Sequence, residues 1–196
     1  FIKENWHSAI IADVENQAKN IRAMYTRMAE KHPKEIQQVE FSPFEGGQKA
    51  KIIKSRGCII DIGSAQQPDS LRSSDLSMLH CSEVGLWKDT QKKTAKDLIQ
   101  TLRAMIVDVP YTAIILESTA KGVGNFFHKE WQKAERGETN YEPVFIPWFK
   151  IEIYHAVKIK KKATYINLMN NFTDYHWWLW EKGATLEAIK WYMKQS

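Results

Sequence analysis

Ser82 and Glu83 directly follow an apolar run at residues 76–81. A run of this length suits a strand buried on both faces of a parallel sheet. Its last residues would then lie at the C-terminal edge, where open α/β folds bind ligands. An enzyme that hydrolyses a nucleoside triphosphate needs a carboxylate there to polarise the attacking water, beside a small oxygen ligand for Mg²⁺. Asp-Glu is the commonest pattern, and serine is a weaker ligand. The alternative is that Glu83 only caps or solvates a strand end.

A second apolar run, at residues 112–116, ends in Glu117, Ser118 and Thr119. Hydroxyls just beyond a parallel strand can hydrogen-bond a γ-phosphate or a catalytic carboxylate, and so sense whether a nucleotide is intact. The alternative is a turn rich in serine and threonine that binds nothing. We expect the chemistry of the chain to lie at the sheet edge where these two runs end.

Arg72 lies in the polar segment 64–75 that leads into the first run. A loop arginine can stabilise the charge that develops on a transferring phosphoryl group, in its own subunit or in a neighbouring one. Most arginines in loops are simply solvated, and this alternative stays open.

The phosphate-binding pattern Gly-x-x-x-x-Gly-Lys-Ser/Thr does not occur in the sequence. The chain also begins without an initiator methionine, so we read it as a piece of a longer protein. A nucleotide hydrolase built in this way would carry its phosphate-binding loop before residue 1. We therefore expect the 196-residue piece alone to bind ATP poorly and to be inactive.

Other metal chemistry has weaker support in the sequence. The six histidines are scattered without ligand spacing, and His80 lies in an apolar run, where a core position is expected. Cys58 and Cys81 are expected to be small buried hydrophobic residues. Asp61 and Glu117 would be the carboxylates of a metal-dependent nuclease, but nothing in the pattern places them together.

The polar residues that follow the two apolar runs must be positioned by the strands and helices around them. The patterns predict strands at 8–14, 39–41, 49–54, 57–63, 76–83, 112–117 and 143–148, and helices at 15–31, 94–107 and 126–136. This rhythm indicates a three-layer α/β domain, with a mostly parallel sheet and helices on both faces.

The composition changes near Lys150, which divides the chain into an α/β domain at 1–150 and a helical linker at 151–196. Four of the five residues at 158–162 are lysines, which suit either a DNA contact or a solvated surface. From Asn171 we expect two helices separated at Gly183. Their tryptophans, Trp177, Trp178, Trp180 and Trp191, either pack the linker or stack on bases.

The overall composition permits an anionic partner without requiring one. The net charge is +5, and 43% of the residues are hydrophobic, as in ordinary globular proteins. No apolar run reaches the roughly 18–20 residues of a membrane helix, and the start is not a signal peptide. We expect a cytoplasmic protein that does not associate with membranes.

Three motifs in this order resemble the large subunit of tailed-phage DNA-packaging terminases. Residues 80–87, His-Cys-Ser-Glu-Val-Gly-Leu-Trp, resemble the Walker B segment of a branch in which Ser-Glu often replaces Asp-Glu. Residues 117–128 resemble the coupling motif and the turn after it, and residues 143–149 match the strand that follows. Residues 181–186 and 191–192 also look like the segment that leads into the nuclease domain of the family.

The resemblance implies a P-loop NTPase-like, RecA-like fold and gives roles to the residues above. Glu83 would be the catalytic carboxylate, and Ser82 would hold the Mg²⁺ side of the bound ATP. Ser118 and Thr119 would contact the nucleotide and couple hydrolysis to DNA movement. Arg72 would reach the nucleotide of a neighbouring subunit.

The resemblance also implies partners. Such motors form a homo-oligomeric ring on the portal protein of a procapsid in the host bacterial cytoplasm. They work with a small terminase subunit and move double-stranded DNA, which a C-terminal nuclease domain cuts.

Two other functions remain open from the sequence. One is another P-loop motor such as a helicase, which would ordinarily continue into a second motor lobe rather than a helical linker. The other is a non-catalytic nucleic-acid-binding or assembly module, whose DNA affinity would fall steeply with salt.

Overall fold

The structure is a computed structural model that describes residues 4–33, 35, 50–53, 56–66, 75–89, 94–156, 158 and 161–195. For residues 50–53 and 162 it describes the backbone only. The chain divides into two compact units, Phe1–Tyr141 and Glu142–Ser196. The division falls before residue 150, where the composition changes, and Trp148 and Phe149 pack with the helices that follow them.

The first unit contains a five-stranded sheet with the strand order β2-β3-β1-β4-β5. The strands are β1 (His7–Ala12), β2 (Ala50–Ile53), β3 (Cys58–Ser64), β4 (Met78–Cys81) and β5 (Ala113–Leu116). All neighbouring pairs are parallel except β2 and β3, which are antiparallel. The predicted mostly parallel sheet is therefore confirmed.

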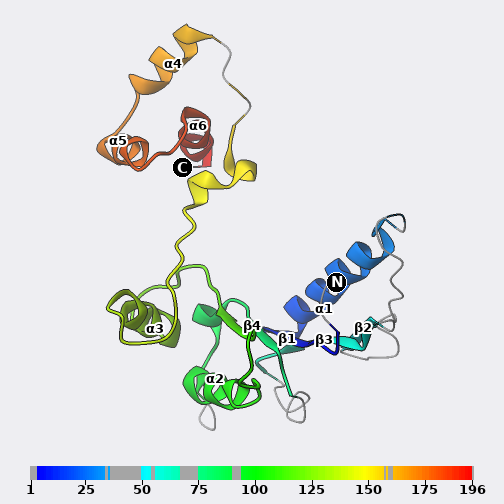
Figure 1. Ribbon diagram of the computed structural model, residues 1–196. Helices are drawn as coiled ribbons and strands as arrows, with labels where there is room; N and C mark the ends of the chain where they lie inside the picture. Colours follow the sequence, from blue (N-terminus) through cyan, green and yellow to red (C-terminus); the bar gives the residue numbers. More distant parts are fainter. Residues whose placement is uncertain are drawn as a thin grey trace. The chain divides into compact units, whose positions relative to one another are not determined.

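Helices cover both faces of this sheet (Figure 1). Ile10 and Ala12 of β1 pack with Ala18 of α1 (Glu15–Glu30). The alternate residues Ala9 and Ile11 belong to the core that α2 (Ala95–Arg103) forms on the opposite face. Because successive residues of a strand point to opposite faces, β1 is buried from both sides and the unit has three layers.

This architecture is the predicted α/β class, and it is consistent with a P-loop NTPase-like fold. The parallel strands are the apolar runs of the sequence, and each is connected to the next by a crossover, as parallel strands require. The predicted strand at 39–41 lies outside the described residues.

Two predicted elements, the strand at 76–83 and the helix at 94–107, are shorter in the structure. Leu76 forms an isolated parallel bridge to Ile106. The Leu76 amide donates to the Met105 carbonyl at 2.8 Å, and the Val107 amide donates to the Leu76 carbonyl at 3.0 Å. These bonds end α2 at Arg103 instead of residue 107. β4 itself is only four residues long, and the left-handed turn at Glu83 follows soon after its last residue, Cys81.

Polar side chains fix the starts of α2 and α3 (Phe126–Glu135), which flank the edge where β4 and β5 end. The Thr94 hydroxyl accepts a hydrogen bond from the Asp97 amide, and the Asp97 carboxylate accepts one from the Thr94 amide. This capping box satisfies two backbone donors that a helix start otherwise leaves without partners. The Asn125 side chain caps α3 by accepting the His128 amide at 2.9 Å.

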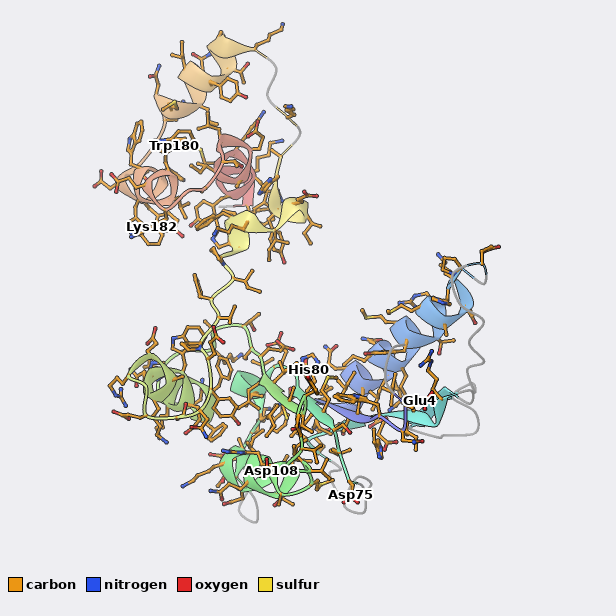
Figure 2. All side chains as sticks on the ribbon, in the orientation of Figure 1. Glu4, Asp75, His80, Asp108, Trp180 and Lys182 are labelled. Atoms are coloured by element: carbon orange, nitrogen blue, oxygen red, sulfur yellow. The ribbon has the colours of Figure 1, made fainter. Side chains whose placement is uncertain are left out.

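The second unit contains α4 (Lys162–Met169), α5 (Asp174–Glu181) and α6 (Leu186–Gln195), after two short 3-10 turns, Trp148–Lys150 and Glu152–Tyr154. Helices α5 and α6 are the two predicted ones, and Gly183 between them has a φ of +90°. The sequence patterns did not indicate α4. Figure 2 shows Trp180 and Lys182 at the end of α5.

The predicted strand at 143–148 is wrong. Residues 142–147 form neither helix nor strand, and Val144, Phe145 and Ile146 are exposed. Pro143 and Pro147 lack the N–H groups that a sheet ladder needs, so an apolar run between them is a poor strand.

The tryptophans of this unit fall into two groups. Trp191 packs against Trp148 and Tyr154, with ring centroids 5.8 and 5.0 Å away, as the packing interpretation predicts. Trp177, Trp178 and Trp180 each keep more than 40% of their surface exposed. None of the helices in the described part of the chain is long and apolar enough to cross a membrane.

The capping box of α2 gives a stability prediction. Replacing Thr94 with Ala removes the hydrogen bond that its hydroxyl accepts from the Asp97 amide and the one that it donates to the Asp97 carboxylate. The free energy of unfolding in urea should therefore fall by about 1 kcal/mol. Thr101→Ala in the same helix is the matched control. The Thr101 hydroxyl only donates to the Asp97 carbonyl within the helix, and its loss should be neutral or slightly stabilising. Equal losses in both variants would contradict this account.

Candidate functional site

The ends of β4 and β5 bring the two predicted segments together. The strands are parallel neighbours, and Cys81 of β4 lies opposite Leu116 of β5. Ser82 and Glu83 therefore leave the sheet beside Glu117, at the same carboxyl edge. The backbone confirms this, because the Glu117 amide donates to the Cys81 carbonyl at 3.0 Å.

Glu83 has a left-handed backbone, with φ 54° and ψ 42°. This conformation costs about 1–2 kcal/mol for a residue with a side chain, so the surroundings must hold it in place. The chain turns at Glu83 into the short 3-10 helix Val84–Leu86. The Val84 amide donates to the Glu117 carbonyl at 3.0 Å and ties the turn to the neighbouring strand.

The Glu83 carboxylate reaches the loop that follows β5. Its Oε2 accepts hydrogen bonds from the Thr119 amide at 3.0 Å and from the Thr119 hydroxyl at 2.8 Å. Glu83 and Thr119 were both predicted as site residues, and the structure brings them into direct contact. Among the described residues, the other oxygen, Oε1, has no hydrogen-bond partner.

Ser118 supports the same loop. Its hydroxyl lies 3.4 Å from Glu83 Oε2 and 2.8 Å from the Thr119 carbonyl oxygen. A hydroxyl has a single proton, and the shorter distance assigns it to the carbonyl, which leaves only a contact with Glu83. The oxygen also accepts the Gly85 amide at 3.0 Å, so Ser118 links the two segments.

Gly85 must be a glycine for this link to form. A Cβ at this position would lie 2.7 Å from Ser118 Oγ and 3.4 Å from the Thr119 carbonyl oxygen. The close approach places the 3-10 turn directly against the Ser118–Thr119 loop. Gly85 is visible in the sequence two residues after Glu83, but its contact with Ser118 is not.

Ser82 is held mainly by its backbone. Its amide donates to the Ile11 carbonyl at 2.8 Å, and its carbonyl accepts the indole N–H of Trp87 at 3.0 Å. His80 lowers the pKa of the Glu117 carboxyl, and the Ser82 hydroxyl adds to this effect, whereas burial opposes it. Ser82 therefore lies at the predicted edge, beside an acidic group of the neighbouring strand.

Asp13 is a site residue that the sequence reasoning missed. Ile11 of β1 lies opposite Cys81 of the parallel strand β4. Two residues further along each chain segment, Asp13 therefore lies near Glu83. Burial raises the pKa of Asp13, and the negative charge of Glu83 adds to this, whereas nearby Lys88 lowers it. The sequence gave little reason to choose Asp13, because the predicted strand included it and continued to residue 14. In the structure β1 ends at Ala12, so Asp13 lies just beyond the strand.

The chemistry of this edge suits a hard cation and phosphate. Ser82, Glu83 and Asp13 offer oxygen ligands, and Mg²⁺ is usually held by one or two carboxylates together with substrate phosphates. Within the described ranges, no three His, Cys, Asp or Glu side chains come together as a ready-made metal cage. A magnesium site at Ser82 therefore remains a prediction that would need the phosphates to complete it.

The structure does not bring Asp61 and Glu117 together. Asp61 of β3 pairs with His7, with 2.6 Å between Oδ2 and Nε2. Because β1 and β4 lie between β3 and β5, the two carboxylates are separated by three strand spacings, or about 14 Å. The paired-carboxylate nuclease is excluded by this topology.

His80 is not the enclosed core residue that its apolar run predicts. Its side chain is 31% exposed, and its Nε2 lies 3.6 Å from Glu117 Oε1. Figure 2 shows His80 on the sheet, away from Asp75, which precedes β4. Cys58 and Cys81 are both buried, as expected. Arg72 lies outside the described residues and keeps its predicted role as a prediction.

No known protein family and no curated protein matches the sequence. Among solved structures, the chain resembles the large terminase ATPase domain of Thermus phage P74-26, with a TM-score of 0.49 and 17% identity over 67% of this chain. A point variant of the same domain gives 0.46 and 18% over 65%. The chain spans about half of these structures, 53% and 52% of their lengths. Both TM-scores are below 0.5, so the functional roles of residues in this chain have to be argued from its own residues.

The contact between Gly85 and Ser118 can be tested by a double-mutant cycle. Gly85→Ala should reduce the free energy of unfolding by about 1–3 kcal/mol, because its Cβ would displace Ser118 Oγ. In a Ser118→Ala background the same substitution should cost less, since the nearest obstructing atom is gone. Additive losses would show that the two residues do not interact as described.

The raised pKa of Asp13 predicts a pH-dependent stability difference. A carboxyl that is harder to ionise in the folded protein destabilises it as the pH rises through the interval above the unfolded pKa. Asp13→Asn should therefore raise the melting temperature near pH 7 by about 1–2 °C and have no effect near pH 3. Asp108→Asn, at an exposed position, is the control and should change neither value. A lower melting temperature for Asp13→Asn at pH 7 would contradict the prediction.

Proposed function

We propose that this chain is part of the ATPase domain of a terminase-type DNA-packaging motor, in which Glu83 activates the water that attacks ATP. The observation that carries the proposal is the contact between the Glu83 carboxylate and Thr119. A carboxylate at the end of a parallel strand, fixed by hydroxyl and amide donors from the adjacent strand end, is what the two sequence motifs were expected to form.

The two carboxylate oxygens of Glu83 have different environments, which suits them to different tasks. Thr119 holds Oε2 through two hydrogen bonds. Oε1 has no partner among the described residues and can accept a hydrogen bond from water. Because Oε2 is fixed, a water on Oε1 would be held in one direction, and orientation of this kind lowers the barrier to attack.

The remaining assignments complete this motor. Ser82 and Asp13 lie where oxygen ligands would hold Mg²⁺, which neutralises the charge of the phosphates. Ser118 and Thr119 would transmit the state of the nucleotide, since any movement of their loop must move Glu83 as well. Arg72 would act on a nucleotide of the same or a neighbouring subunit.

The cellular setting follows from the same proposal. The parent protein would bind double-stranded DNA, a portal protein and a small terminase subunit, and assemble as a ring in the bacterial cytoplasm. Residues 1–150 would belong to its ATPase domain and residues 151–196 to a helical linker toward a nuclease domain. A phosphate-binding loop would come from the sequence upstream of residue 1.

The test is ATP hydrolysis by the natural protein extended upstream to include the predicted phosphate-binding loop. Glu83→Gln keeps the shape of the side chain but cannot take up a proton, and it should lower kcat by about 10²–10⁴-fold. Glu135→Gln, on the exposed surface of α3, is the matched control and should leave kcat unchanged. The 196-residue chain alone should hydrolyse nothing.

Three other outcomes would contradict the proposal. A folded, extended protein that hydrolyses ATP equally well with Glu83→Gln would remove Glu83 from the site. An extended protein that binds DNA with a steep salt dependence, but hydrolyses nothing, would favour a binding or assembly module. ATP-driven strand separation would instead favour a helicase.

A further inference from the structure

The indole ring of Trp87 is hydrogen-bonded to the turn that contains Glu83. Its Nε1 donates to the Ser82 carbonyl oxygen at 3.0 Å. The short 3-10 helix Val84–Leu86 lies between the two residues in the chain and brings the ring back to the end of β4. Among the described residues, no other donor reaches this carbonyl oxygen.

Trp87 has a fixed position because it belongs to the core. It is only 7% exposed, and it is part of the buried cluster that includes Ile11 of β1 and Leu98 of α2. A buried indole N–H needs a hydrogen-bond partner, and a ring enclosed by close-packed neighbours cannot turn to find a different one. The core therefore holds the donor in place, and the donor holds the carbonyl.

The Ser82 carbonyl belongs to the peptide bond that precedes the strained residue. The φ of Glu83, +54°, depends on the orientation of this peptide. Turning the Ser82–Glu83 peptide over by about 180° would bring φ to a negative value, in the region that residues with a side chain ordinarily adopt. Such a rotation would relieve the strain and would change the direction in which the Glu83 side chain leaves the backbone.

Two backbone anchors of the turn do not oppose this rotation. The Ser82 amide donates to the Ile11 carbonyl, and the Val84 amide donates to the Glu117 carbonyl. Both amides belong to neighbouring peptide bonds and would stay in place. The hydrogen bond from Trp87 is made to the rotating peptide itself. The rotation would break it and leave a buried N–H without its partner, which is unfavourable.

We infer that Trp87 is a positioning residue whose indole N–H holds the Ser82–Glu83 peptide, and with it the direction of the Glu83 carboxylate. The inference rests on the proposed function, and it gives Trp87 no contact with the nucleotide. Thr119 fixes the end of the Glu83 side chain, whereas Trp87 fixes the backbone from which that side chain starts.

The simpler alternative is a core tryptophan whose N–H takes the nearest acceptor and only adds stability. Trp6 provides the comparison, because its Nε1 donates to Ser8 Oγ at 2.9 Å in the same unit. Ser8 lies at the amino end of β1, whereas Glu83 follows the carboxyl end of the parallel strand β4. If the alternative holds, losing either indole hydrogen bond should have the same small effect on catalysis.

The experiment compares Trp87→Phe with Trp6→Phe in the upstream-extended protein, at a temperature where both variants are folded. Phenylalanine keeps an aromatic ring and removes the N–H. We expect kcat for ATP hydrolysis to fall by about 10-fold to 100-fold in Trp87→Phe, and to stay within about twofold in Trp6→Phe. KM for ATP should stay within about twofold in both, because the nucleotide contacts are intact. Unchanged kcat in Trp87→Phe, or an equal fall in both variants, would overturn the inference.

A second replacement separates the hydrogen bond from the packing. Phenylalanine is smaller than tryptophan and leaves space in the core, which can itself loosen the turn. Site-specific replacement of Trp87 by 3-benzothienylalanine keeps the size of the ring and puts sulfur in place of the N–H. This variant should lower kcat as Trp87→Phe does, and it decides the question if Trp87→Phe does not fold. A wild-type kcat would assign the effect to the volume of the ring and overturn the inference.

A third readout reports on the backbone and needs no activity. In NMR spectra of the nucleotide-free protein, the three-bond coupling between the amide and α protons of Glu83 depends on φ. It should rise in both Trp87 variants, as the peptide turns over and φ enters the extended region, and it should keep its wild-type value in Trp6→Phe. A wild-type coupling in the Trp87 variants would overturn the inference even if kcat fell.

The design also separates this inference from the function on which it rests. If Glu83→Gln leaves hydrolysis unchanged, the proposed role of Glu83 has failed, and the coupling alone decides whether Trp87 holds the peptide. If Glu83→Gln lowers kcat as expected while Trp87→Phe has no effect on it, only the positioning role has failed.

Discussion

The left-handed backbone at Glu83 is the constraint on which the candidate site depends. A residue with a side chain adopts this conformation at a cost of about 1–2 kcal/mol, and it persists only where the surrounding structure holds it. Here the holding groups come from β5 and the loop after it, through the Glu117 backbone and Thr119. The strained residue follows β4, and the groups that hold it follow β5. The site therefore exists only when these two strands are paired.

The order of the strands explains why so many polar groups meet at one edge. Strands β1, β4 and β5 are consecutive parallel neighbours, so their carboxyl ends open at the same side. Asp13, Glu83 and Glu117 each follow one of these strands within two residues. Three carboxylates at one edge would repel one another. Lys88 beside Asp13 and the donors on Glu83 and Glu117 offset that repulsion.

The sequence predicted the structural features that depend on local patterns. It did not predict the features that depend on how the strands pair. The apolar runs located β4 and β5, and the polar residues behind them proved to be in contact. Asp13 was missed because its role depends on the register of β1 against β4, which no local pattern encodes. The apolar run between Pro143 and Pro147 was taken for a strand because its composition was judged without the N–H groups that pairing requires. The competing carboxylate pair, Asp61 and Glu117, likewise failed on strand order alone.

The serine at position 82 is explained by its neighbour across the strand end. His80 and the Ser82 hydroxyl both lower the pKa of the Glu117 carboxyl, which favours its charged form. An aspartate at position 82, as in the commoner Asp-Glu pattern, would place a second negative charge against that carboxylate, and one of the two groups would have to bind a proton or turn away. Serine carries no charge and avoids this conflict. The residue types at positions 82 and 117 therefore have to be considered as a pair.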